Sequence, residues 1–376
     1  MAFSPGNLLV VGAGFSFNAG LPLASEFTSR LLEVSNLRLD GPSNAQVRFI
    51  RTFVDQVFGE GAERAADQWP ELEDIFTLID LSANTGHHLG PKYSASQLRV
   101  VRRAIIVRMI RMLSQEYKRV QRKPDAKWKL LEQFFERFDA ASTAVLSMNW
   151  DTVFEQGIAR TQNIRRFDYG CDASSVAFRK GLLSTRLERG ETLRILKPHG
   201  STNWLYCDAC RETFWVTPSE TEQVAQTLFR SRDWDELLNK KARRLATLTP
   251  HCPHCEADSL GTRFATFSYR KALDFPMHAA SWRTAERHLK RSFDWVFLGY
   301  SMPAADFEFK NLLKRVQLTE GERPKITVIT GGSDADATVT RFKKFFGETS
   351  GQRTYFTEGL NLAALKHLQD IQVLRA

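Results

Sequence analysis

The chain has 376 residues, of which 43% are hydrophobic and 11% aromatic, and its formal net charge is +9. This composition excludes a disordered chain, and the sequence has no run of about eighteen uncharged apolar residues with which to cross a bilayer. The length allows one large domain with an insertion, or two ordinary domains. The positive charge favours nucleic acid, acidic partners or anionic ligands without choosing among them.

The N-terminus, Met1-Ala2-Phe3-Ser4, carries neither a basic start nor a cleavable apolar segment. We therefore expect a soluble, cytoplasmic protein without membrane association. The first predicted element is the short strand in "NLLVVGAGFS", and a helix is predicted from Leu23 to Val34, with Phe27, Leu31 and Leu32 on one face.

Between this strand and helix lies a glycine turn. Such a turn lets backbone N–H groups approach a pyrophosphate at a helix N-terminus, although a tight turn without any ligand is the alternative. A dehydrogenase site also expects an acidic residue at the end of a second strand about twenty positions later. Here that distance falls within the helix at Glu33, or beyond it at Asp40, which disfavours hydride transfer. The turn comprises Gly12, Ala13, Gly14, Phe15 and Ser16, with Gly20 further on.

Residues 44–139 give an almost continuous helical signal and are predicted to form a helical insertion. The helix predicted from Arg99 to Lys123 is strongly basic. Nucleic acid or an acidic partner is one interpretation, but a solvated helix face is favoured, because no aromatic stacking pattern accompanies the charges. "NKKARR" at 239–244 has the same ambiguity. The basic residues of the helix are Arg102, Arg103, Arg108, Arg111, Lys118, Arg119 and Arg122.

Four further short strands follow in "STAVLSMN", "LRILKPHG", "FDWVFLGYS" and "KITVITGG", with helices between most of them. Each strand ends in Gly, Asn, His or Ser. Parallel strands that alternate with helices form a doubly wound sheet, with its site at the carboxyl ends of the strands. The sequence therefore predicts an α/β, Rossmann-like parallel sheet.

Four of the five cysteines form two C-x-x-C knuckles, Cys207 with Cys210 and Cys252 with Cys255. Two such knuckles fit tetrahedral Zn²⁺ in a closed structural site, whereas disulfides are disfavoured in a reducing compartment. His251 and His254 are alternative ligands beside the second knuckle. Between the knuckles we expect a helical segment around Glu222 to Leu245, and Cys171 is interpreted as a small buried apolar residue.

These elements suggest three units. Residues 1–43, 140–204 and 262–376 form the Rossmann-like domain, residues 44–139 the helical insertion, and residues 205–261 a zinc-ribbon-like module with a helical insert.

The order of the strand ends resembles the sirtuin family, from residue 7 to about residue 332. The resemblance implies NAD as the bound nucleotide, with contacts from the glycine turn and from Gly20, Leu21, Pro22, Trp150, Gly299, Tyr300 and Ser301. It is carried by five motifs in order: the glycine turn with Ala19-Gly20-Leu21-Pro22, Met148-Asn149-Trp150-Asp151, Lys197-Pro198-His199-Gly200-Ser201, the two cysteine knuckles, and Leu298-Gly299-Tyr300-Ser301.

The details look less like the protein deacetylases than like the divergent sirtuin-like domains of bacterial antiphage systems, which hydrolyse NAD. Deacetylases continue with Asp-Phe-Arg where this chain has Leu23-Ala24-Ser25, and they carry a Phe-Gly-Glu segment where it reads "FATFSYRKALDFP". Both departures put acyl-lysine binding in doubt. "HGSTNW" and "GYSMPAAD" look like the divergent group.

Cleavage of the nicotinamide–ribose bond needs no acid, because the leaving group departs as a neutral pyridine. His199 is predicted to be the general base, and Asn149 to hold the ribose hydroxyls or the water. The resemblance places Asp151 near the nicotinamide. The alternatives are a core histidine for His199 and helix caps for Asn149 or Asp151.

Less specific predictions concern the last two strands. Ser301 and Gly299 are expected near phosphate or ribose, whereas Asp306 is equally well explained as a helix N-cap. Gly331, in the turn that follows "KITVIT", is expected near the adenosine, with a plain turn as the alternative.

Three functional classes follow. The first is an NAD⁺ glycohydrolase that depletes NAD⁺ during infection, controlled by homo-oligomerisation or by a separately encoded partner such as a translocase-type ATPase or an Argonaute-like protein. The second is an NAD-dependent protein deacylase. The third is a regulatory protein that binds NAD or ADP-ribose without turnover.

Overall fold

A seven-stranded parallel sheet forms the centre of the computed structural model, which describes residues 6–33, 41–59, 68–187, 189–238, 250–262, 275–319, 323–347 and 353–376. The strand order is β12-β11-β10-β1-β2-β6-β3, and every neighbouring pair is parallel. This confirms the predicted α/β fold class. The strands are β1 (Asn7–Val11), β2 (Thr143–Ser147), β3 (Arg166–Asp168), β6 (Thr192–Leu196), β10 (Asp294–Leu298), β11 (Lys325–Ile329) and β12 (Arg353–Phe356).

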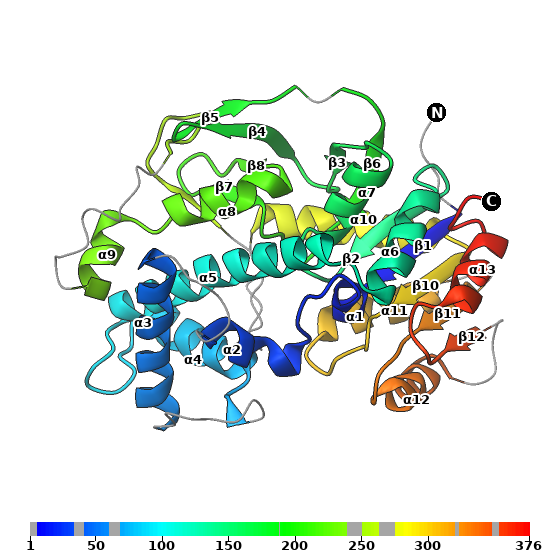
Figure 1. Cartoon of the computed structure of the whole chain (residues 1–376), viewed down its shortest axis with the longest axis horizontal. Coiled ribbons are helices and arrows are strands. Elements are labelled where there is room, and N and C mark those ends of the chain that lie inside the picture. Colours follow the sequence, from blue (N-terminus) through cyan, green and yellow to red (C-terminus); the bar gives the residue numbers. More distant parts are fainter. Residues whose placement is uncertain are drawn as a thin grey trace.

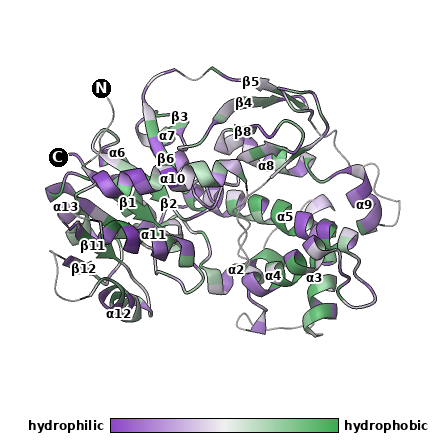
Figure 2. Cartoon of the chain, turned by 180° about the vertical axis from the view of Figure 1, so that it is seen from behind, coloured by the Kyte–Doolittle hydropathy of each residue, from purple (hydrophilic) through white to green (hydrophobic). Residues whose placement is uncertain are grey.

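Helices cover both faces of this sheet, so its central strands are largely apolar. All five residues of β1 are buried, and they alternate between two cores: Leu9 and Val11 face one, Leu8 and Val10 the other. One face packs against α1 (Ala13–Phe17), α6 (Ala126–Arg137), α7 (Val153–Thr161) and α13 (Leu362–Asp370). The other face packs against α10 (Pro276–Arg291), α11 (Phe307–Gln317) and α12 (Ala335–Phe346). Figure 2 shows the hydrophobic strands β1 and β2 between these helices.

A bundle beside the sheet is built from α2 (Ala24–Leu32), which precedes the segment 44–139 expected to form the helical insertion, and from α3 (Gly41–Phe58), α4 (Leu72–Thr85) and α5 (Ala95–Arg122) (Figure 1). The last of these is the longest, at 28 residues or about 42 Å. It begins in a capping box, in which the Ser94 hydroxyl accepts a hydrogen bond from the Gln97 N–H and the Gln97 side chain accepts one from the Ser94 N–H. It runs from the insertion to the sheet and so joins the two.

Most of the basic residues of α5 pair with acidic neighbours. Arg108 is fully buried, and its Nε donates to the Leu31 carbonyl oxygen at 3.3 Å. The remaining pairs join α5 to α4, to the small module and to itself, so internal ion pairing accounts for much of the basic run that was considered for nucleic acid. The pairs are Arg102 with Asp80, Arg103 with Asp233, Arg111 and Lys118 with Glu222, and Arg119 with Glu116.

A second sheet, in the order β5-β4-β8-β7-β9, forms the small module. Its strands are β4 (Ala173–Arg179), β5 (Leu182–Thr185), β7 (Trp204–Cys207), β8 (Thr213–Trp215) and β9 (Leu260–Gly261). The strands β4 and β5 pair within this sheet. They precede residue 205, where the small module was expected to begin, so they belong to a segment that was assigned to the Rossmann-like domain.

The helical segment expected between the cysteine knuckles consists of α8 (Pro218–Thr227) and α9 (Ser231–Leu238). The rest of that segment, including "NKKARR", lies outside the described residues, as does most of "FATFSYRKALDFP". Among the residues that the structure describes, every helix is too short or too polar to span a bilayer.

The chain order of the strands creates a crevice at the centre of the sheet. From β1 the chain moves to β2 on one side and later returns to β10 on the other, so neighbouring connections leave the sheet in opposite directions. Ligand sites of doubly wound sheets lie at such a switch point, outside the carboxyl ends of the strands.

Candidate functional site

A cavity of about 210 Å³ lies at this switch point. The loops that follow β1, β2, β6 and β10 all contribute to it, so four separate stretches of sequence meet there. Of the residues predicted to act on the ligand, the structure brings together Gly12, Ala13, Ser16, Leu21, Pro22, Asn149, Trp150, Asp151, His199, Tyr300 and Ser301. Gly14, Phe15, Gly20, Gly299 and Gly331 do not line it.

The Asn149 side chain is fixed by two hydrogen bonds that it donates. Its Nδ2 lies 2.8 Å from the Gly12 carbonyl oxygen and 2.9 Å from Ser16 Oγ. Reversing the amide would place two acceptor oxygens together at Gly12, so the orientation is determined. Both N–H groups are therefore committed to the protein, and Asn149 offers a ligand its carbonyl oxygen, an acceptor.

Asp151 is held at both carboxylate oxygens. Oδ2 accepts a hydrogen bond from Ser16 Oγ at 2.7 Å, and Oδ1 accepts one from the Val153 N–H at 2.9 Å, in the first turn of α7. The N-cap residue of α7 is Thr152, so the second bond is a local contact of Asp151 with the backbone two residues on, and Asp151 is not the N-cap. Asp151 thus serves α7 and also lines the cavity.

His199 follows β6 and is buried, with 6% of its surface exposed. Its Nδ1 lies 3.4 Å from the Met148 carbonyl oxygen, and its ring stands edge-on to Trp282 at a centroid distance of 5.8 Å. A carbonyl oxygen accepts only from a protonated nitrogen, so this contact favours the tautomer with the proton on Nδ1 and the lone pair on Nε2.

Beneath these residues lies a buried ion pair. Lys197 Nζ is 3.1 Å from Glu155 Oε1, both side chains are at most 1% exposed, and the same ammonium donates to the Asp151 carbonyl oxygen. Burial raises the pKa of Glu155, and the charge of Lys197 opposes that shift. The pair ties the loop 149–151 to β6 and α7. No role was predicted for Lys197, although it belongs to the "KPHG" motif.

The glycines of the first turn meet the backbone at the end of β10. The N–H of Gly14 donates to the Gly299 carbonyl oxygen at 2.8 Å, and that of Gly12 to the Leu298 carbonyl oxygen at 3.2 Å. A Cβ on Gly299, whose φ is +65°, would lie 2.1 Å from the Phe15 nitrogen, and one on Gly12 would lie 2.6 Å from the Gly299 oxygen. These amides therefore face protein carbonyls, whereas the sequence suggested that they face a ligand.

Phe15 and Gly20 have packing roles. The Phe15 ring is 1% exposed and packs in an aromatic cluster whose other members include Phe134, Phe135 and Phe154. Gly20 has a φ of +79°, and a Cβ there would lie 2.1 Å from a methyl carbon of Val120 on α5. Both residues fix the turn against neighbouring helices and stay out of the cavity.

The loop after β10 is held by a buried hydrogen bond. The Tyr300 hydroxyl donates to Asp306 Oδ2 at 2.9 Å, and burial raises the Tyr300 pKa well above its ordinary value. Asp306 occupies the N-cap position of α11, yet its side chain makes no capping hydrogen bond there. Asp306 therefore has the predicted N-cap position but does not cap the helix with its side chain. Gly331 packs against Gly359 instead.

The helical bundle beside the sheet also reaches the cavity, through Phe27 of α2, Glu73 of α4 and Leu113 of α5. Sequence reasoning missed this contribution. Phe27 and Leu113 have the ordinary periodicity of core residues, and Glu73 stands in the first turn of a helix, where acidic residues are common. Nothing local in the sequence marks these positions.

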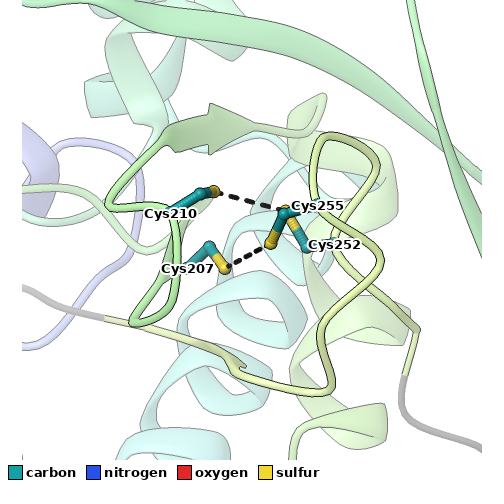
Figure 3. A group of neighbouring side chains, drawn as sticks. All are labelled: Cys207, Cys210, Cys252 and Cys255. Carbon is teal, nitrogen blue, oxygen red and sulfur yellow. Dashed lines mark hydrogen bonds between the residues drawn. The ribbon is translucent and has the colours of Figure 1, made fainter.

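The four knuckle cysteines form one cluster in the small module, shown in Figure 3. Their sulfur atoms all lie within 4.8 Å of one another, with Cys207 3.6 Å from Cys255 and Cys210 3.7 Å from Cys252. Tetrahedral Zn²⁺ with Zn–S bonds of about 2.3 Å places its sulfurs about 3.8 Å apart. A disulfide would need about 2.05 Å, so the arrangement fits zinc and excludes disulfides.

The two knuckles have the same backbone turn. In the first, the Arg211 N–H donates to the Cys207 carbonyl oxygen at 2.8 Å, and in the second the Glu256 N–H donates to that of Cys252 at 2.9 Å. Arg211 and Glu256 both have positive φ, 64° and 60°. The same turn, with a positive φ at the residue after each second cysteine, thus occurs in two unrelated stretches of sequence. Binding of one metal ion by both pairs of thiols would explain this similarity. His251 and His254 are not members of the cluster.

Comparisons with known proteins add little. No protein-family model matches the chain, and no curated protein matches it. Solved structures that are similar include one from work on the structural basis of sirtuin substrate affinity, 12% identical with a TM-score of 0.38, covering 97% of this chain and 93% of that one. Another is Sir2 with the inhibitor EX-527, 2'-O-acetyl-ADP-ribose and a deacetylated p53 peptide, 12% identical with a TM-score of 0.33, covering 98% and 94%. At such TM-scores a shared fold is not established, so the strand order and registers of this chain support its fold.

Proposed function

We propose that the protein is an NAD⁺ glycohydrolase whose cavity holds the nicotinamide riboside half of NAD⁺. The observation that carries this proposal is the convergence of Asn149, Asp151 and His199 on one cavity at the switch point of the sheet. The volume of about 210 Å³ is below the roughly 300 to 1,000 Å³ of typical small-molecule sites, so part of the dinucleotide would extend beyond the cavity.

In the proposed reaction the bond between the anomeric carbon and the nicotinamide nitrogen breaks, and its electron pair leaves with the nicotinamide. A water oxygen then bonds to the anomeric carbon and gives its proton to Nε2 of His199. The products are nicotinamide, ADP-ribose and a proton. The Asn149 carbonyl oxygen accepts a hydrogen bond from a ribose hydroxyl or from the water, and the Asp151 carboxylate stabilises the positive charge that develops on the sugar.

The apolar part of the cavity supports this chemistry. Leu21, Pro22, Phe27, Leu113 and Trp150 surround the polar groups, so a bound sugar would be shielded from bulk water. Electrostatic interactions are stronger in such surroundings than in water. Glu73, which the insertion contributes, gives the cavity a second carboxylate, which we assign to the carboxamide or a ribose hydroxyl of the ligand.

The direct test is to incubate purified full-length protein with NAD⁺, with and without an acetylated peptide, and to follow nicotinamide, ADP-ribose and cyclic products. We expect peptide-independent release of nicotinamide. His199→Ala should lower the rate by about a hundredfold or more, since a positioned general base contributes 10²- to 10⁴-fold, and Asn149→Ala should also lower it, because the ribose or the water loses its acceptor. His87→Ala, at an exposed histidine outside the cavity, is the matched control and should keep full activity.

The other outcomes select the alternatives. Turnover only with acetylated peptide would indicate the NAD-dependent deacylase, and NAD⁺ binding without turnover would indicate the regulatory protein. Control by homo-oligomerisation or by a separately encoded ATPase partner, and a role in antiphage defence, stay predictions of the sequence resemblance. They are tested by repeating the assay with the candidate partner present.

A further inference from the structure

A second cavity, of about 340 Å³, lies where α10 packs beside the edge strand β3 and its neighbour β6. It shares no lining residue with the first cavity. Its volume is within the range of small-molecule sites, about 300 to 1,000 Å³. Nothing in the proposed reaction uses it.

The charge of this cavity is strongly positive. Arg283, Arg287 and Arg291 line it from one face of α10, at four-residue intervals of about 6 Å along the helix axis. Arg194 of β6 lines it too, but it pairs with Asp168 at 2.5 Å. Within the part of the chain that the structure describes, neither Arg283 nor Arg291 has a hydrogen bond or ion pair. Asp172 is the remaining acidic residue of the lining, so the positive charge is in excess.

His288, in the wall of this cavity, is also affected by the positive charge of the arginines. Burial, together with the guanidinium groups of Arg194, Arg287 and Arg291, lowers the pKa of His288 to about 4, and Asp168 opposes the shift. Arg194 Nη1 lies 3.2 Å from His288 Nε2, and because arginine can only donate, Nε2 accepts and the ring proton is on Nδ1.

We propose that this cavity binds a phosphorylated sugar, the class that includes nucleotides. Guanidinium groups recognise phosphate through paired, charge-assisted hydrogen bonds, and Arg283 and Arg287 are placed to supply them. The Asp172 carboxylate accepts hydrogen bonds from sugar hydroxyls. Both halves of such a ligand thus find a complementary group, and the inference does not depend on the proposed NAD⁺ hydrolysis.

The experiment measures binding of ribose 5-phosphate, ribose and inorganic phosphate by isothermal titration calorimetry, at fixed ionic strength. We expect ribose 5-phosphate to bind more tightly than inorganic phosphate, and ribose not to bind. The variant Arg283→Ala with Arg287→Ala should weaken ribose 5-phosphate binding at least tenfold. Both side chains are exposed, so the variant should fold, which a thermal melt checks.

Two controls make the result specific. Lys343→Ala with Lys344→Ala removes the same charge from the exposed side of α12 and should leave the affinity unchanged. Asn149→Ala with His199→Ala alters the first cavity and should also leave it unchanged. Equal weakening in the lysine variant would show a nonspecific charge effect, and loss only in the Asn149 and His199 variant would assign the ligand to the first cavity. Either outcome, or no binding at all, overturns the proposal.

Discussion

Lys197 Nζ lies 3.1 Å from Glu155 Oε1, and the two side chains are 0% and 1% exposed. The same ammonium donates to the Asp151 carbonyl oxygen, so a buried ion pair supports the loop that carries Asn149 and Asp151. Removing one partner of a buried ion pair leaves an uncompensated charge, whereas replacing both with apolar groups is often neutral or stabilising.

This pair gives the first prediction. Lys197→Met should lower the free energy of unfolding by about 3 to 5 kcal/mol, because Glu155 then remains buried without its cation. Lys197→Met with Glu155→Leu should be more stable than the single variant. Urea denaturation of the protein, both singles and the double variant measures the coupling energy, and simple additivity of the two single effects would contradict the interpretation.

The second prediction concerns the cysteine cluster. Purified protein should contain one zinc per chain by atomic absorption. Cys252→Ser should lose that zinc and melt at a lower temperature, because metal affinity contributes directly to the folding of a small module. Cys171→Ser lies outside the cluster and should retain both the zinc and the melting temperature. A chelator that removes zinc without changing the melt would show that the metal does not stabilise the module.

The third prediction compares two glycines. Gly299 and Gly332 have φ values of +65° and +83°, but only Gly299 has backbone atoms in the way of a Cβ. Gly332→Ala should therefore cost about 1 kcal/mol, from backbone conformation alone. Gly299→Ala should cost at least about 2 kcal/mol more, because the β1–α1 turn must move away. If both variants lost the same free energy of unfolding in chemical denaturation, the β1–α1 turn would be able to move away from β10 without destabilising the protein, which contradicts this prediction.

The fourth prediction is a pH dependence of stability. Burial lowers the pKa of both His278 and His288 to about 4, with the Pro198 backbone opposing the shift for His278 and neighbouring arginines contributing to it for His288. In the unfolded chain both titrate near 6.5, so between about pH 6.5 and 4 the unfolded state binds more protons. The free energy of unfolding should therefore fall as the pH is lowered through this window.

Urea denaturation at pH 7 and pH 5 tests this dependence. The variant His278→Gln with His288→Gln should lose less stability between the two pH values than the unaltered protein does. His87→Gln, at an exposed position, should behave like the unaltered protein. If the double variant lost as much free energy of unfolding between pH 7 and pH 5 as the unaltered protein does, the dependence would arise from carboxylates instead of these histidines.

The sequence predicted much of the fold. Alternation of short apolar strands with helices predicted the parallel sheet, and the strands at 7–11, 143–147, 192–196, 294–298 and 325–329 are all present. The knuckle spacing predicted the cysteine cluster, since C-x-x-C fixes two sulfurs locally. These features depend on periodicities of a few residues, which a sequence shows directly.

Other features depended on contacts between distant segments. The edge strands β3 and β12 and the mixed small sheet were missed, because short strands are defined by their partners, and β4 pairs with β8 some forty residues away. In the same way, the basic run of α5 read as a solvated face until the structure placed Asp80, Glu222 and Asp233 beside it.

By itself, the sequence determined that polar residues follow the strands and that four thiols come in two pairs, because both are properties of neighbouring residues. Only the tertiary structure decided that Asn149 offers an acceptor, that the glycine turn packs on Gly299, and that Glu73 reaches the cavity. Each of these depends on atoms brought together from more than fifty positions apart. Such roles depend on burial and hydrogen bonds that form only when distant segments come together in the folded protein.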